Sequence, residues 1–122
     1  MKYFIICVLI LLSCGKNLAD EDGDFRGKRP SNLVYSPDTL TYIPSTQFSI
    51  TSATPTFTQG SGSNARFTIT YPINNSIKIN ELTGVVTVYN TIGGSQLYNL
   101  DIKIENIAGS TTFTNALIID VK

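Results

Sequence analysis

The sequence predicts an all-β fold for residues 31–122, a sandwich of about seven strands. Apolar and polar residues alternate with a period of two over much of this region, as they do in strands with one buried face. Clusters of glycine, proline, asparagine and serine interrupt the alternation about every 8–12 residues, the spacing expected of turns between short strands. No window repeats apolar residues at helical spacing over three turns.

The first 13 residues have the features of an export signal. Lys2 gives a positively charged start, and residues 4–12 form an unbroken apolar run. As a helix this run would be about 14 Å long, half of the roughly 30 Å hydrocarbon core of a bilayer. It is therefore too short to span a membrane, and a small residue at its end fits a cleaved signal peptide.

Cys14 is predicted to carry lipid, because residues 11–14 (Leu-Leu-Ser-Cys) resemble the lipobox of bacterial lipoproteins. The resemblance implies cleavage between Ser13 and Cys14, diacylglycerol on the thiol, and an acyl chain such as palmitate on the new amino terminus. The alternative is an ordinary secretory signal with a chance cysteine. Cys7 leaves with the signal, so the mature chain keeps one cysteine and forms no internal disulfide. Several acyl chains suffice for permanent membrane attachment.

Residues 14–30 are predicted to be a flexible tether, because they are polar and contain few large apolar side chains to offset the entropy of ordering. Four acidic residues lie within positions 20–24. They allow two other interpretations: a calcium site, or a surface-export tag resembling those of some Bacteroidetes lipoproteins. The run lacks the spacing and the distal glutamate of an EF-hand, so a solvated tether is the favoured interpretation.

The clearest predicted strands lie in the second half of the domain. Residues 67–71, 77–79, 98–104 and 113–121 each alternate between an apolar and a polar face. Weaker candidates are residues 33–35, 41–43 and 48–50. This number of short strands is typical of an immunoglobulin-like sandwich. Six aromatic side chains are expected in its core: Tyr35, Phe48, Phe67, Tyr71, Tyr98 and Phe113.

Residues 77–88 (IKINELTGVVTV) and 98–110 (YNLDIKIENIAGS) resemble the immunoglobulin-like, cadherin-like repeat of bacterial surface proteins. Residues 30–36 and 40–42 resemble its first strands. The repeat is common in surface lipoproteins of leptospires and of Bacteroidetes. The resemblance implies a cadherin-like β-sandwich displayed on a cell surface. Asn106 replaces the acidic strand-end residue of calcium-binding cadherins, so calcium bridging is not expected.

The composition argues against catalysis and nucleic-acid binding. The chain has no histidine, the commonest general base and metal ligand, so a Ser-His-Asp triad is impossible within it. Asp101 and Lys103 share the polar face of one predicted strand, and Glu105 lies near its end. Exposure of this face to solvent explains these charged residues without a catalytic role. The basic residues form no patch that would release phosphate counterions. We therefore expect no enzyme activity, no metal, and no cofactor beyond the covalent lipid on Cys14.

The sequence thus predicts a non-catalytic lipoprotein of the outer membrane, held at the cell surface and carrying an adhesion or binding module. Its expected partners are the membrane, through the lipid, and a host or cell-surface protein or glycan. Loops and sheet edges are the usual contact sites, which makes Tyr42, Asn74, Asn75 and Tyr89 candidate ligand contacts. The alternative is a periplasm-facing structural or assembly lipoprotein without an extracellular ligand.

Overall fold

A computed structural model of the chain describes residues 27–122. The predicted signal, the lipidation site at Cys14 and the acidic run lie outside the described residues. The described part is all β, which confirms the predicted fold class, although it contains nine strands rather than about seven. They are β1 (Ser31–Val34), β2 (Thr39–Tyr42), β3 (Ser49–Thr51), β4 (Thr56–Thr58), β5 (Arg66–Tyr71), β6 (Ile77–Ile79), β7 (Val86–Tyr89), β8 (Gln96–Asn106) and β9 (Gly109–Val121).

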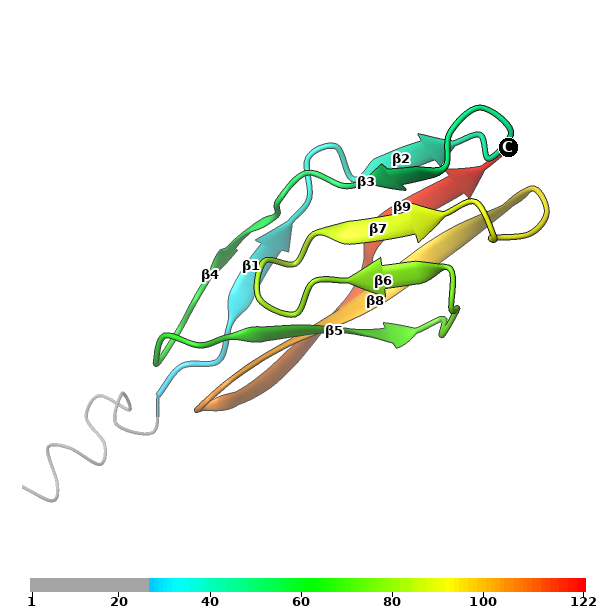
Figure 1. The fold of residues 1–122 in the computed structure, drawn as a ribbon. Helices are drawn as coiled ribbons and strands as arrows, with labels where there is room; N and C mark the ends of the chain where they lie inside the picture. The colour runs from blue at the N-terminus through cyan, green and yellow to red at the C-terminus, as the bar shows by residue number, and fades with distance from the viewer. Residues whose placement is uncertain (1–26) are drawn as a thin grey trace, which may run out of the picture.

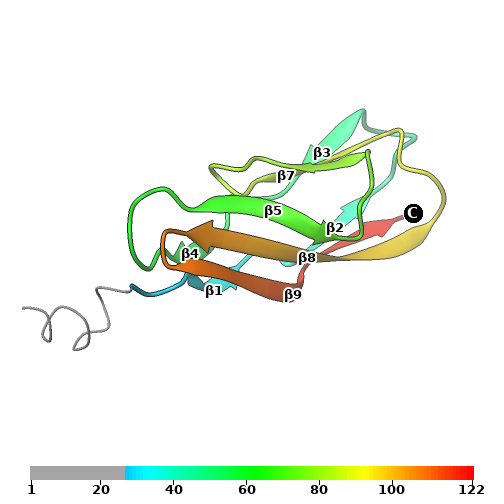
Figure 2. The ribbon, with the colours of Figure 1, turned by 90° about the horizontal axis from the view of Figure 1, so that it is seen from below.

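The strands form two layers (Figures 1 and 2). One layer is a four-stranded sheet in the order β2-β9-β8-β5, and the other is a three-stranded sheet in the order β3-β7-β6. The short strands β1 and β4 pair with each other and form a separate two-stranded sheet. The pairing of β2 with β9 is parallel, and the remaining pairs are antiparallel. No helix among residues 27–122 is long and apolar enough to cross a membrane.

The core lies between the two sheets. The alternation predicted for residues 98–104 is confirmed, because Leu100, Ile102 and Ile104 of β8 are fully buried. Val86 and Val88 of β7 come from the opposite sheet and are equally buried. Burying one such side chain stabilises the fold by about 1.5–3 kcal/mol. The other core residues are Tyr35, Leu40, Tyr42, Ala65, Phe67, Ile77, Ile92, Tyr98, Leu117, Ile119 and Val121.

A bulge interrupts β9. Leu100 pairs with Leu117, but Ile102 pairs with Phe113, so β9 has two more residues than β8 between these pairs. Asn115 takes a positive φ of 52°, and its N–H donates to Asp101 Oδ1 at 2.9 Å. Beyond the bulge the pairing continues to the turn, so β9 begins at Gly109 instead of the predicted residue 113.

Hydrogen bonds join the described chain to the domain from Lys28 onward, before the predicted start at residue 31. The Lys28 N–H donates to Ser61 Oγ at 2.7 Å. The buried side-chain amide of Asn106 donates to the carbonyls of Lys28 and Gln59, at 2.8 and 3.1 Å. Pro30 is fully buried. The last residues of the predicted tether are therefore part of the folded domain.

Two of the six aromatic residues predicted to be in the core lie on the surface. Phe48 is 71% exposed and Tyr71 is 65% exposed. Phe48 precedes β3, so the sheet that buries Ile50 no longer covers it. Tyr71 ends β5, after a register shift that follows Ile69, and the shift turns its ring outward. The prediction of burial is wrong for these two rings; Tyr35, Phe67 and Tyr98 are buried and Phe113 is partly buried.

Candidate binding surface at the distal end

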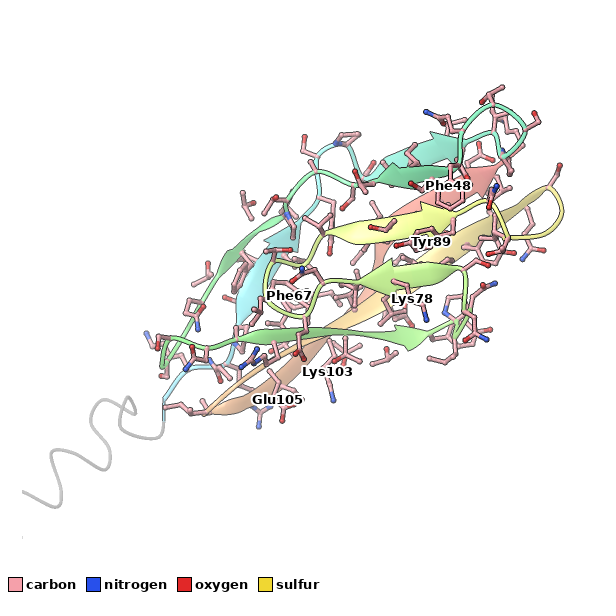
Figure 3. All side chains as sticks on the ribbon, viewed as in Figure 1. Phe48, Phe67, Lys78, Tyr89, Lys103 and Glu105 are labelled. Carbon is pink, nitrogen blue, oxygen red and sulfur yellow. The ribbon has the colours of Figure 1, made fainter. Side chains whose placement is uncertain are left out.

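Two aromatic side chains on the surface meet at the end of the sandwich opposite Gly27, where the described chain begins (Figures 1 and 3). They are Phe48, before β3, and the half-buried Tyr89, at the end of β7. Their ring centroids lie 6.2 Å apart with an interplanar angle of 75°, an edge-to-face contact. We call the surface formed by Phe48, Tyr89, Asn74 and Asn75 the distal surface.

The backbone of Phe48 is held in place from two sides. Its carbonyl accepts a hydrogen bond from the Asn90 N–H at 2.9 Å and one from the Tyr42 hydroxyl at 3.0 Å. The same hydroxyl lies 2.9 Å from the carbonyl of Gln47. An exposed ring on a fixed backbone loses little freedom when a ligand covers it, which favours binding.

Tyr42 itself is not available to a ligand, so the prediction that it is a contact is wrong. Its side chain is 0% exposed, because alternate residues of β2 point into the sandwich. Burial raises the pKa of its phenol above the ordinary value. Tyr42 therefore holds the backbone of Phe48 through a hydrogen bond instead of touching a ligand.

The structure brings the other three predicted contacts together. The Tyr89 N–H donates to the carbonyl of Ser76 at 2.8 Å, which places the β5–β6 loop beside the end of β7. Asn74 Oδ1 accepts the Ser76 N–H at 2.8 Å, so this side chain shapes the loop. Asn75 is exposed. Tyr89, Asn74 and Asn75 thus share one end of the molecule with Phe48.

A groove of about 280 Å³ runs from this loop between the edge strands β5 and β6. Its lining combines apolar side chains with hydroxyl, amide and ammonium groups. The lining residues are Thr68, Ile69, Pro72, Ile73, Asn74, Asn75, Ile77, Lys78 and Ile79.

A larger groove of about 540 Å³ lies between β1 and β9, next to the β9 bulge. Threonines, Asn115 and the Asp38 carboxylate line it, together with apolar side chains of β1. The aromatic rings at this groove, Tyr35 and Phe113, are buried or partly buried. The distal surface differs because one of its two rings, Phe48, is exposed, so we regard it as the better candidate.

The acidic side chains of the described region are dispersed over the surface. Asp101 accepts the backbone N–H of Asn115, and Glu105 lies 3.9 Å from Lys103 in an exposed ion pair. Glu81 pairs with Arg66 at 3.8 Å. Within residues 27–122 no group of three potential metal ligands comes together.

No protein-family model and no curated protein sequence matches this chain. The resemblance to the cadherin-like repeat therefore remains a prediction, and the sandwich itself is what the structure shows. Solved structures with a similar fold include three from Bacteroides species.

Two of them are proposed alpha-galactosidases of Bacteroides fragilis, the second also described as a melibiase. Each has a TM-score of 0.55 and 15% identity, over 77% of this chain and 18% of that chain. The third is a SusE-like surface-located polysaccharide-binding protein from the heparin utilisation locus of Bacteroides thetaiotaomicron. Its TM-score is 0.53 and its identity 19%, over 74% of this chain and 16% of that chain. This chain spans less than a fifth of each of these proteins, and at such identity the likeness shows a shared fold alone.

Proposed function

We propose that this chain is a non-catalytic, lipid-anchored protein of the outer membrane that binds glycans at the cell surface. The observation that carries the proposal is the contact between the exposed Phe48 and the half-buried Tyr89, at the end of the sandwich opposite Gly27. Burial of an aromatic side chain in the core stabilises a fold, and a ring that remains in contact with solvent lacks part of this stabilisation. A ligand that covers the two rings recovers this stabilisation.

The chemistry of the pair fits sugars. The C–H faces of a pyranose ring are apolar and cover an aromatic ring, while the hydroxyls at the ring edge bond to amides such as Asn75. Two rings at 75° present faces at nearly a right angle. This shape favours a single soluble glycan chain over a flat crystalline polysaccharide, which would need coplanar rings.

The position of the pair suits surface display. The predicted anchor at Cys14 and the folded domain at Gly27 are separated by a stretch that spans at most roughly 45 Å when fully extended. A domain attached through Gly27 presents its opposite end to the surroundings (Figure 1). The SusE-like neighbour, a surface-located polysaccharide-binding protein with this fold, supports both the ligand class and the location.

Glycan binding is tested by affinity electrophoresis of the purified protein through gels containing a panel of polysaccharides. We expect retardation by at least one polymer, and at least about tenfold weaker binding for Phe48→Ala and Tyr89→Ala, as for aromatic residues at the centre of an interface. The matched control is Leu82→Ala, since Leu82 is also exposed, at 63%, and lies in the β6–β7 turn. Unchanged binding by both aromatic variants would exclude the distal surface.

Anchoring and location need a separate experiment. We expect radiolabelled palmitate to enter the wild type and not Cys14→Ala, and external protease to digest the protein on intact cells. Labelling of Cys14→Ala would show that the lipid prediction is wrong. Protection from protease would favour the periplasm-facing alternative.

A further inference from the structure

We propose that the distal surface selects acidic glycans and that Lys78 binds their carboxylate or sulfate groups. The inference rests on the proposed glycan-binding function and adds the class of ligand. It follows from the charge and the neighbours of Lys78 on β6.

Lys78 is the one charged residue among the strands β3, β6 and β7. It is exposed, and it belongs to none of the ion pairs found within residues 27–122. Those pairs join Arg66 to Glu81, Lys103 to Glu105, and Lys122 to Asp120. An anion that approaches Lys78 therefore meets a cation without having to displace a carboxylate.

The strand register places Lys78 beside the aromatic pair. Lys78 is opposite Thr87 of β7, and both side chains point away from the core because their strand neighbours point into it. Tyr89 lies two residues further along the same face, so it is a diagonal neighbour of Lys78, at roughly 7–8 Å between backbone positions. Figure 3 shows the order Phe48, Tyr89 and Lys78 across the three strands. A sugar unit that stacks on Tyr89 can place an acidic substituent next to Lys78.

None of the residues that pair with β6 or β7, or that line the groove beside them, is charged apart from Lys78. Small hydroxyl residues, Ser49 and Thr51, lie opposite Tyr89 and Thr87 on the outer side of β3. Lys78 is also the only charged residue that lines the 280 Å³ groove, whose other polar residues are neutral. The groove is slightly smaller than the roughly 300–1,000 Å³ of pockets that enclose a whole small ligand. We infer that it holds one part of the glycan, while the rest lies across the sheet.

A lysine ammonium acts as a compact point charge with rotatable donors. It binds a carboxylate or a sulfate without the fixed two-point geometry that a guanidinium imposes. Lys78 is therefore suited to either acidic group, and the experiment must distinguish carboxylate from sulfate.

The test measures binding of the full chain to three immobilised polymers: dextran, which is neutral, hyaluronan, which carries carboxylates, and dextran sulfate, which carries sulfates. We expect the wild type to bind at least one acidic polymer about tenfold more tightly than dextran, and salt to weaken this binding. Lys78→Gln should abolish the preference, and Lys78→Arg should retain part of it. Lys103→Gln is the matched control, since it removes the same charge from the outer face of the other sheet.

The outcomes separate the inference from the function on which it rests. Equal binding of dextran and the acidic polymers, weakened by Phe48→Ala, would overturn the acidic preference and leave glycan binding intact. A preference that survives Lys78→Gln, or that Lys103→Gln removes, would also overturn it. Absence of binding to these polymers and to the wider panel would overturn the proposed function itself.

Discussion

Gly84, in the turn between β6 and β7, is a position where one added methyl group is expected to destabilise the fold. Its φ is +80°, and a Cβ at this position would lie 2.8 Å from Phe67 Cε2 and 2.8 Å from Pro55 Cγ. A left-handed backbone costs an L-residue about 1–2 kcal/mol. Overpacking a filled core costs about 1–3 kcal/mol more. Gly84→Ala should therefore lower the free energy of unfolding by about 2–5 kcal/mol.

Two glycines of the β7–β8 loop separate these causes. Gly94 has a φ of +69° but no atom within 4 Å of the added carbon, so Gly94→Ala should show the backbone cost alone, about 1–2 kcal/mol. Gly93 also faces open space and lacks the positive φ, so Gly93→Ala should be neutral or stabilising by up to about 1 kcal/mol. Urea unfolding followed by far-ultraviolet circular dichroism measures all three. If Gly84→Ala is no less stable than Gly94→Ala, the packing argument is refuted.

Three further predictions concern the polar groups. Burial raises the pKa of Tyr35, so the folded state keeps a proton that the unfolded chain releases above about pH 10. The contribution of Tyr35 to the free energy of unfolding should be complete below that pH and decline above it, so the decline should be less steep in Tyr35→Phe. This variant also loses about 1 kcal/mol, because it lacks the 2.6 Å hydrogen bond to the Gly84 carbonyl. Urea titrations between pH 8 and 11 that give parallel curves for the two proteins would contradict this. Asn106→Ala removes three hydrogen bonds to backbone groups and should cost about 2–3 kcal/mol in the same unfolding assay, and a cost near zero would mean that water replaces them. Glu81→Gln breaks only an exposed ion pair with Arg66, so it should change stability by less than about 1 kcal/mol, and a larger loss would reveal an unrecognised contact.

The sequence predicts the central strands well because their buried face is continuous. Tyr98, Leu100 and Ile102 alternate without interruption on β8, and period two alone identifies such a strand. The same rule fails where the pairing is irregular. The start of β9 is hidden by the bulge around Asn115, and β4 offers one apolar residue, Phe57, between polar neighbours.

The candidate site is predicted in part for a similar reason. Turn residues mark Asn74 and Asn75, but the alternation places Phe48 on the same side as the partly buried Ile50 and so predicts burial. What exposes Phe48 is the end of the strand, and periodicity does not encode where a sheet stops covering its neighbours. Lys78 is visible as the polar residue between two apolar ones. That Lys78 forms no ion pair within residues 27–122 is a property of the assembled sheets.

The stretch from Gly27 to Phe48 has a mechanical consequence. It contains β1 and β2, which run one after the other along the length of the sandwich, from the end at Gly27 toward the end that carries Phe48 (Figure 1). A ligand pulling on Phe48 against an anchored Gly27 stretches these two strands lengthwise. The ladders that join them to β4 and β9 then bear the load in shear, so their hydrogen bonds must rupture together instead of unzipping singly.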